Sequence, residues 1–375
     1  MKKFIYIVLK TLLILILGIF LLLSAGFFAV RFGWTNVAGE ENTDSFEYNK
    51  IAKEEIILIR DENVKLPEIE SIYGPNEELN RCKLGVASRY NDLITASILK
   101  AYLNSRSEIL LNRMLLALKL RLPNREAFEA DILNCEKNSS SAPSLDELRA
   151  RLASPKDKNI YSWQNGESWS IIREAIIKDK KSITDTALEA GVQPRLLLSV
   201  AIVEQLRLYY TQRELFEKFF KPLKILANAN KMAWGVMSIK EKMAIQTEDY
   251  LKDSNSVFYP GDAYNKLLDF PDNIDKNKER YNRLTNSKDH YYSYLYGSLI
   301  IKELESQWKK AGYSLAYRPE IIATLFNIGF DNSKPKEDPM VGGSTIEIEG
   351  EKYFFGSLAY EFYYSGELVD EFPFN

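Results

Sequence analysis

The chain has 375 residues, with 49 Lys or Arg, 52 Asp or Glu and a single histidine, and its formal net charge is −3. This balance, without a basic stripe interleaved with aromatic residues, argues against nucleic acid as a partner. One histidine, His290, and no Cys-x-x-Cys pair argue against a zinc site and against a histidine-dependent nucleophile. We therefore expect no metal and no cofactor.

The N-terminal segment is a long apolar run. Residues 11–30 carry no charge, Lys2, Lys3 and Lys10 precede them, and acidic residues follow. About 20 apolar residues span a bilayer core, and the lysine-rich flank stays in the cytoplasm. The pattern predicts that residues 1–35 form a cytoplasmic tip and a single-pass anchor in the cell membrane, with the remaining chain extracytoplasmic. A cleaved export signal is the alternative.

Residues 36–155 are predicted to form a linker followed by a helical region. Apolar residues at helical spacing predict three helices, which cover residues 87–103, 106–120 and 124–135. Ser144 is expected to cap a further helix that begins Leu-Asp-Glu. The two cysteines, Cys82 and Cys135, also lie here. A disulfide suits an extracytoplasmic location, but the sequence alone does not give their separation, so their pairing stays open.

The central part contains a markedly apolar helix that ends in a carboxylate. Pro194 suits a first helical position, and Leu196 to Val203 carry no charge, which is typical of a buried helix. Glu204 follows, and an ionised carboxylate there costs several kcal/mol unless it is paired or protonated. A protonated carboxyl is suited to be the general acid of a glycosidase. The alternative is a structural ion pair with Arg207, one helical turn away.

Helices are also expected around this one, over residues 169–178, 183–189, 213–229, 240–253 and 291–311, with a short helix opened by Pro319. Residues 254–290 are polar and are predicted to be rich in loops.

Two later segments follow the glutamate in a defined order: Gly235-Val-Met-Ser-Ile and Leu325-Phe-Asn-Ile-Gly. Together with Glu204 they resemble the motifs of the lysozyme-like superfamily, specifically soluble lytic transglycosylases and goose-type lysozymes. Those families typically carry Glu-Ser, Gly-Leu-Met-Gln-Ile and Ala-Tyr-Asn-x-Gly. Here Gln205, Ser238 and Phe326 replace the usual Ser, Gln and Tyr, and the gap between the first two motifs is longer than usual.

The resemblance covers about residues 165–332. It implies a mainly α fold with a lysozyme-like domain at 156–332 that cleaves the MurNAc-GlcNAc β-1,4 bond of peptidoglycan glycan strands. Glu204 would protonate the leaving oxygen, the sugar's N-acetyl group would stabilise the cationic centre, and Glu204 would then take the C6 hydroxyl proton to give a 1,6-anhydro product. Water as the acceptor would make the enzyme a hydrolase.

No second carboxylate is fixed by a motif, and Glu214 and Asp331 are more typical of surface charge. Two alternatives to the enzyme are a non-catalytic glycan-binding or scaffolding protein of the cell envelope, and an unrelated membrane-tethered helical interaction protein.

Six residues are candidates for substrate binding: Gly235, Met237, Ser238, Asn327, Tyr294 and Tyr317. Gly235 lets backbone approach a ligand closely, whereas Met237 is expected mainly to hold its turn against the core. Ser238 is a possible weak donor in place of the usual Gln. Asn327 lines the cleft by resemblance, or only caps its helix, and the two tyrosines are candidates to hold Glu204.

Residues 333–375 lie outside the resemblance. The segment from Thr345 to Phe355 alternates in polarity about a Glu-Gly turn, which predicts a short C-terminal β-hairpin. The sequence leaves open whether this tail packs beside the groove or presents a free strand edge.

Overall fold

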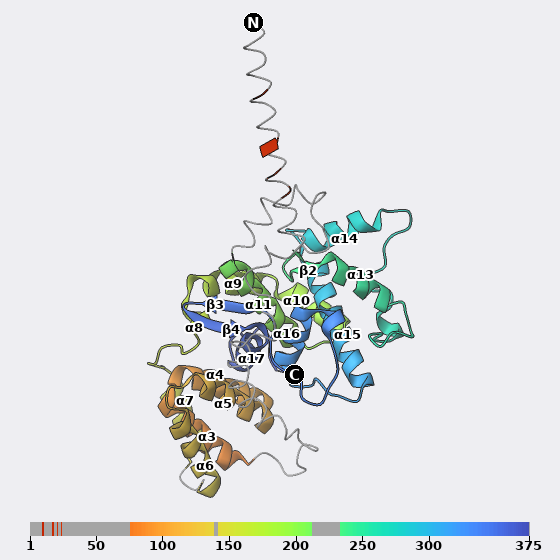
Figure 1. Ribbon diagram of the computed structural model, residues 1–375. Helices are drawn as coiled ribbons and strands as arrows, with labels where there is room; N and C mark the ends of the chain where they lie inside the picture. Colours follow the sequence, from red (N-terminus) through yellow and green to blue (C-terminus); the bar gives the residue numbers. More distant parts are fainter. Residues whose placement is uncertain are drawn as a thin grey trace.

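The computed structural model describes residues 76–138, 142–211 and 233–374, with five isolated positions among the first 24. Over these ranges the chain is mainly helical, as predicted, with two small antiparallel sheets (Figure 1). None of the helices in this part of the chain is both long and apolar enough to cross a membrane. The predicted anchor at 11–30 lies outside the described residues except at Leu17, Gly18, Leu21 and Ser24.

The N-terminal region is a layer of five helices: α3 (Glu77–Tyr90), α4 (Asp92–Ser105), α5 (Glu108–Arg121), α6 (Arg125–Lys137) and α7 (Leu145–Leu152). Ser144 caps α7 in a capping box with Glu147, as its sequence predicts. The prediction of a single helix over 87–103 is wrong at its start, because α3 ends at Tyr90 and α4 begins at Asp92. Asn91 is extended there (φ −158°), and its side chain accepts the Ile94 N–H, so one helix ends and the next begins.

The two cysteines are joined. Cys82 on α3 and Cys135 on α6 form a disulfide with a Cα–Cα distance of 5.8 Å. The bond closes a loop across a sequence separation of 53 residues, and it ties the first and fourth helices of this region together. The pairing that the sequence left open is therefore present.

The central region surrounds one buried helix, α11 (Pro194–Thr211). Every residue from Leu196 to Glu204 is buried. The helices and strands around it are α8 (Ser162–Asn165), α9 (Glu167–Lys178), α10 (Lys180–Glu189), β1 (Ala233–Trp234), β2 (Ile239–Lys240), α13 (Glu241–Tyr250), α15 (Tyr291–Lys310) and α16 (Pro319–Ile328). Of these, α9, α10, α15 and α16 pack directly against α11, which explains why it tolerates no charge along most of its length.

Helix α14 (Lys276–Thr285) was not expected from the sequence. Within the polar stretch 254–290, it follows the 3₁₀ turn Asp262–Tyr264, and its N-cap Asp275 accepts the N–H groups of Asn277 and Lys278. Its arginines Arg280 and Arg283 are buried, so polarity here does not mean exposure. The helix expected over 213–229 lies outside the described residues.

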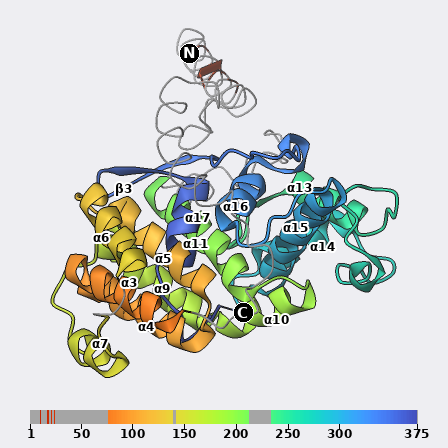
Figure 2. The same cartoon turned by 90° about the horizontal axis from the view of Figure 1, so that it is seen from below.

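The C-terminal segment begins with the predicted hairpin. Strands β3 (Thr345–Ile348) and β4 (Glu351–Phe354) pair through Ile348 and Glu351, and the two turn residues between them have positive φ. A second 3₁₀ turn, Phe330–Asn332, precedes the hairpin, and α17 (Phe355–Tyr364) follows it. This last helix was not expected; it is buried along its whole length and packs against α5, α11 and α16 (Figure 2).

The tail is fastened to α11 by one fully buried arginine. Arg195, in the first turn of α11, donates to the carbonyls of Tyr363 (2.8 Å), Glu367 (2.9 Å), Phe372 (3.0 Å) and Phe362 (3.3 Å). Burial lowers the pKa of Arg195 to about 10, which leaves it charged at neutral pH. The C-terminal segment therefore packs into the same core as α11.

Candidate functional site

Glu204 lies near the end of α11 and is only 2% exposed. Arg207, one turn later, donates to it through Nε (3.1 Å) and Nη2 (2.5 Å), and both contacts go to Oε2. Of the two ways in which a buried carboxylate is tolerated, pairing and protonation, the structure shows pairing. The carboxyl oxygen Oε1 is not engaged by this arginine.

The end of α11 is joined directly to the second motif. Gln205 donates from Nε2 to the backbone carbonyl of Val236 at 2.5 Å. The residue that replaces the usual serine thus tethers the Gly235–Ile239 turn to the residue beside Glu204. A link between residues 31 positions apart leaves no signal in either local pattern, and sequence reasoning did not find it.

Gly235 is required by its surroundings. Its φ is +69°, and a Cβ at this position would lie 2.1 Å from the Leu284 carbonyl oxygen and 2.7 Å from Ser293 Oγ. The glycine therefore allows the turn to pack closely against α14 and α15, and the described residues give it a structural reason that needs no ligand.

Met237 and Ser238 form the inner part of this turn. Met237 is fully buried and its N–H donates to Ser293 Oγ at 3.2 Å. Its side chain packs at Gly297 of α15, where a Cβ would lie 2.7 Å from Met237 Cε. Met237 therefore holds the turn against the core, as expected. Ser238 has a φ of +48° and is 8% exposed, so little of it reaches solvent.

Asn327 lies one residue before the end of α16 and faces the loop that leads into β3. Its Oδ1 accepts both the N–H (2.8 Å) and the hydroxyl (2.9 Å) of Ser344. This double contact fixes which side of the amide faces the loop. The helix is instead ended by Gly329, whose N–H bonds to the Leu325 carbonyl at 2.9 Å. Asn327 is therefore not a side-chain cap of its own helix.

The two candidate tyrosines lie in different settings. Tyr294 on α15 is buried and its hydroxyl donates to Asp179 Oδ2 at 3.0 Å, where His290 Nδ1 also lies 2.6 Å away. Burial and the nearby Asp179 raise the pKa of Tyr294 well above its usual value. Tyr317 is half exposed. Among the described residues, no hydrogen bond joins either hydroxyl to Glu204.

A polar group that sequence reasoning missed lies past Glu204 on α11. Tyr210 contacts Ser168 Oγ of α9 at 2.9 Å and donates to Glu349 Oε1 at 3.1 Å. Glu349 occupies the turn between β3 and β4. The Glu-Gly turn was visible in the sequence, but its position beside the end of α11 depends on a contact across 139 residues.

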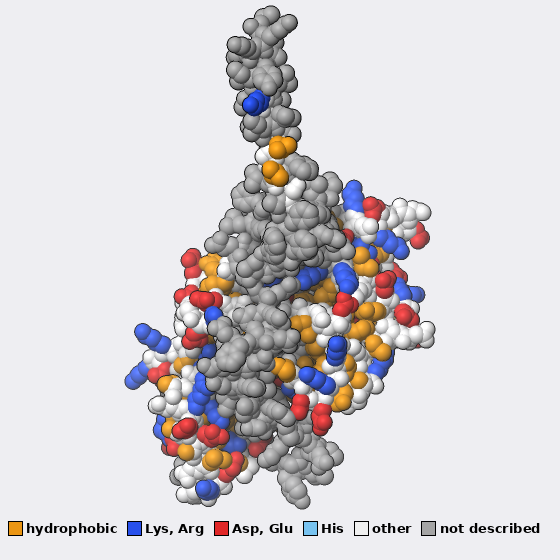
Figure 3. All heavy atoms as spheres, viewed as in Figure 1, with side chains coloured by type: hydrophobic (Ala, Val, Ile, Leu, Met, Phe, Trp, Pro, Cys, Tyr) orange, Lys and Arg blue, Asp and Glu red, His pale blue; other side chains and the backbone are white. Residues whose placement is uncertain are grey.

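The charges of the region do not form a metal centre. In the described ranges, no three His, Cys, Asp or Glu residues are grouped so that they could hold a metal ion. Asp331, one of the two conceivable second carboxylates, is exposed and pairs with Lys242 and with Gln246 (3.0 Å). These contacts lower the pKa of Asp331. Glu214 lies outside the described residues. On the face shown in Figure 3, acidic and basic side chains are intermixed.

Comparisons with protein-family models, with characterised proteins and with solved structures return no match. The functional conclusion therefore depends on the residues and contacts of this chain.

Proposed function

We propose that the protein is a membrane-anchored enzyme that cleaves peptidoglycan, a lytic transglycosylase or muramidase, with Glu204 as its general acid and base. The observation that carries the proposal is the link between Gln205 and Val236. It joins the end of a buried helix, where the glutamate lies, to the turn that follows it in the motif order. The third motif lies on α16, which packs against the same helix.

The chemistry uses the two oxygens of Glu204 differently. Arg207 contacts Oε2 only, so Oε1 is the oxygen that would exchange a proton with the glycosidic oxygen and then with the accepting hydroxyl. The arginine would stabilise the carboxylate after the proton has left. Because no second carboxylate is required, the N-acetyl group of the substrate supplies the stabilisation that a second acid gives in other glycosidases.

The proposed location is the cell membrane, with residues 11–30 as the anchor and the helical regions extracytoplasmic. The disulfide between Cys82 and Cys135 supports this side, because disulfides persist in oxidising compartments and are rare in the cytosol.

A non-catalytic glycan-binding protein of the cell envelope is the second candidate. The observation that favours it is the ion pair itself, since Glu204 and Arg207 are both buried, at 2% and 9% exposure. A buried pair of this kind also serves structure alone, and removal of either partner is then destabilising.

The experiment that tests the proposal is mass spectrometry of soluble products after purified peptidoglycan is treated with the full chain in detergent. Muropeptides with a 1,6-anhydro end indicate a transglycosylase, and products with a reducing end indicate a hydrolase. Binding of peptidoglycan without product release supports the second candidate. If the protein neither binds peptidoglycan nor releases soluble products, both candidate functions are overturned.

A further inference from the structure

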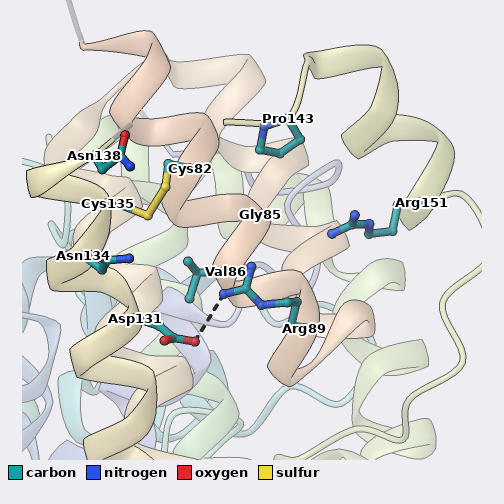
Figure 4. A pocket seen from close by; sticks show the side chains of 10 residues that line it. All are labelled: Cys82, Gly85, Val86, Arg89, Asp131, Asn134, Cys135, Asn138, Pro143 and Arg151. Atoms are coloured by element: carbon teal, nitrogen blue, oxygen red, sulfur yellow. Dashed lines mark hydrogen bonds and ion pairs between the residues drawn. A yellow bond between two sulfur atoms is a disulfide. The ribbon is translucent and has the colours of Figure 1, made fainter. Parts of the chain in front are cut away.

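A separate cavity lies in the N-terminal helical region, on different elements from Glu204. It has a volume of about 250 Å³ and lies between α3, α6 and the chain that leads into α7 (Figure 4). Its apolar part includes Val86, Pro143 and the Cys82–Cys135 disulfide. Gly85 lets Pro143 close one side, because a Cβ there would lie 2.9 Å from Pro143 Cγ.

The walls of this cavity carry more positive than negative charge. Its lining includes two arginines, Arg89 and Arg151, but a single acid, Asp131. That acid is already shared, since Arg89 Nη2 and the Tyr90 hydroxyl each donate to its Oδ2 at 3.2 Å. An anion that enters the cavity therefore meets a net positive lining.

Arg151 is the lining cation with donors left for such an anion, although Glu147, one turn earlier on α7, is near enough to interact with it electrostatically. It reaches from α7 toward α3 (Figure 4) and donates through Nη1 to Ser88 Oγ at 3.0 Å. Among the described residues no carboxylate forms an ion pair with it. A guanidinium presents several N–H donors in a fork that matches a carboxylate, and one neutral hydroxyl leaves most of that capacity unused.

Asn134 adds a group that suits a peptide. Its side chain lines the cavity from α6 and is exposed there, and an amide both donates and accepts hydrogen bonds, as a peptide bond does. A short peptide with small side chains matches these groups. Its carboxylate would meet Arg151, its peptide bond would meet Asn134, and its side chains would meet the apolar patch at Val86 and the disulfide.

We propose that this cavity binds a short peptide that ends in a free carboxylate, with the carboxylate on Arg151. A volume of about 250 Å³ lies below the usual range of pockets for drug-sized ligands, so the ligand is the size of one or two residues. The stem peptides of peptidoglycan end in such a carboxylate. Naming them as the source of the ligand rests on the proposed function. The binding site itself does not require Glu204.

The test is isothermal titration calorimetry of the full chain in detergent with D-alanyl-D-alanine and with its C-terminal amide. A charge-assisted bond to the carboxylate predicts that the amide binds about 10- to 100-fold more weakly. Arg151→Gln should remove this preference, and Arg151→Lys should keep part of it. Glu204→Gln should bind as the unaltered chain does, which separates failure of this site from failure of the proposed activity.

Arg149→Gln is the matched control. Arg149 lies on the same helix, is exposed and pairs with Asp146 at 3.2 Å, and it does not line the cavity, so affinity should not change. Thermal unfolding by circular dichroism checks that each variant folds. Three outcomes overturn the proposal: no binding of the dipeptide at millimolar concentration, equal binding of the acid and the amide, or tighter binding of inorganic phosphate than of the dipeptide.

Discussion

Glu204 is held by Arg207 at one carboxyl oxygen only, so variants can separate its proposed chemical role from its structural one. Glu204→Gln keeps the shape of the side chain but removes the group that can take up and release a proton. We expect turnover of peptidoglycan to fall by about 10⁴-fold, the upper end for a general acid, with the fold retained. Release of soluble muropeptides per folded molecule is the measurement.

Arg207→Gln is the companion variant. It leaves a buried carboxylate without its partner and is expected to cost about 3–5 kcal/mol of stability, while the folded fraction keeps measurable turnover. If Glu204→Gln turns over at the full rate, the catalytic role is refuted, whatever its effect on stability.

A second buried glutamate, Glu303 on α15, has no such partner. It is fully buried, and neither carboxyl oxygen has a hydrogen-bond partner. The nearby Thr247 hydroxyl opposes the effect of burial on the pKa of this carboxyl, but it donates its own hydrogen bond to the Met243 carbonyl at 3.0 Å. Burial therefore raises the pKa of Glu303 well above its usual value and favours the neutral form of this carboxyl in the folded protein.

This raised pKa gives the stability a defined pH dependence. The unfolded chain releases the proton above a pKa of about 4.3, whereas the folded chain retains it, so folding loses stability as pH rises from there toward the folded pKa. Glu303→Gln should remove that loss. Urea unfolding should show the variant more stable than the unaltered chain at pH 7, and the difference should shrink as the pH falls toward 4. The exposed Glu337→Gln should match the unaltered chain at both pH values.

At the scale of elements, α11 and the C-terminal segment depend on each other through Arg195. Arg195→Gln cannot serve the four carbonyls that the guanidinium reaches, and unsatisfied buried groups cost about 1–3 kcal/mol each. We expect a loss of about 3–5 kcal/mol in the free energy of unfolding, with earlier chymotryptic cleavage in residues 355–374, which contain several Phe and Tyr residues.

Arg173→Gln is the control for this effect. Arg173 reaches the same segment by an exposed ion pair with Glu367 at 3.2 Å, which contributes at most about 1 kcal/mol. Equal losses from the two variants would contradict the role assigned to Arg195.

The disulfide is expected to stabilise the N-terminal helical region against unfolding. Loop closure over the 53 residues between Cys82 and Cys135 corresponds to about 4 kcal/mol in the chain-entropy model. The double variant Cys82→Ser with Cys135→Ser should lose stability of that order in urea unfolding. Reductant should lower the stability of the unaltered chain but not that of the variant. Insensitivity of both to reductant would show that the bond does not form.

At the scale of the whole molecule, the N-terminal helices dock on the C-terminal segment. Arg121 of α5 pairs with the buried Glu361 of α17, whose other oxygen accepts from Trp163 Nε1 at 2.9 Å. Arg121 also pairs with Glu351 of β4 at 3.2 Å and lies over the Tyr353 ring. The two helical regions and the tail therefore share contacts, and we expect them to unfold together.

The orientation of the chain in the membrane is a property of the whole molecule. A lysine-rich N-terminus and an apolar run at 11–30 predict that the helical mass lies outside the cytoplasm. Protease added to spheroplasts should digest the helical regions while a cytoplasmic marker survives. If these regions stay protected until the membrane is broken, the predicted orientation is wrong and the protein has no access to the proposed substrate.

The sequence by itself determined the features that are encoded within a few residues. The apolar run before Glu204, the Ser144 capping box and the Glu-Gly turn of the hairpin each depend on neighbours one or two turns away, and each was predicted correctly. Helices α14 and α17 escaped prediction because partners far along the chain bury their polar or aromatic faces, which overrides local composition.

Only the tertiary structure decided how these elements meet. The disulfide, the link from Gln205 to Val236, the pairing of Asn327 with Ser344 and the four carbonyls around Arg195 join residues from 17 to 177 positions apart. Such contacts follow from chain packing and leave no periodic signal. The sequence could place Glu204 in a buried helix with Arg207 one turn away as a candidate partner, but only the structure showed that the pair forms and which carboxyl oxygen the arginine contacts.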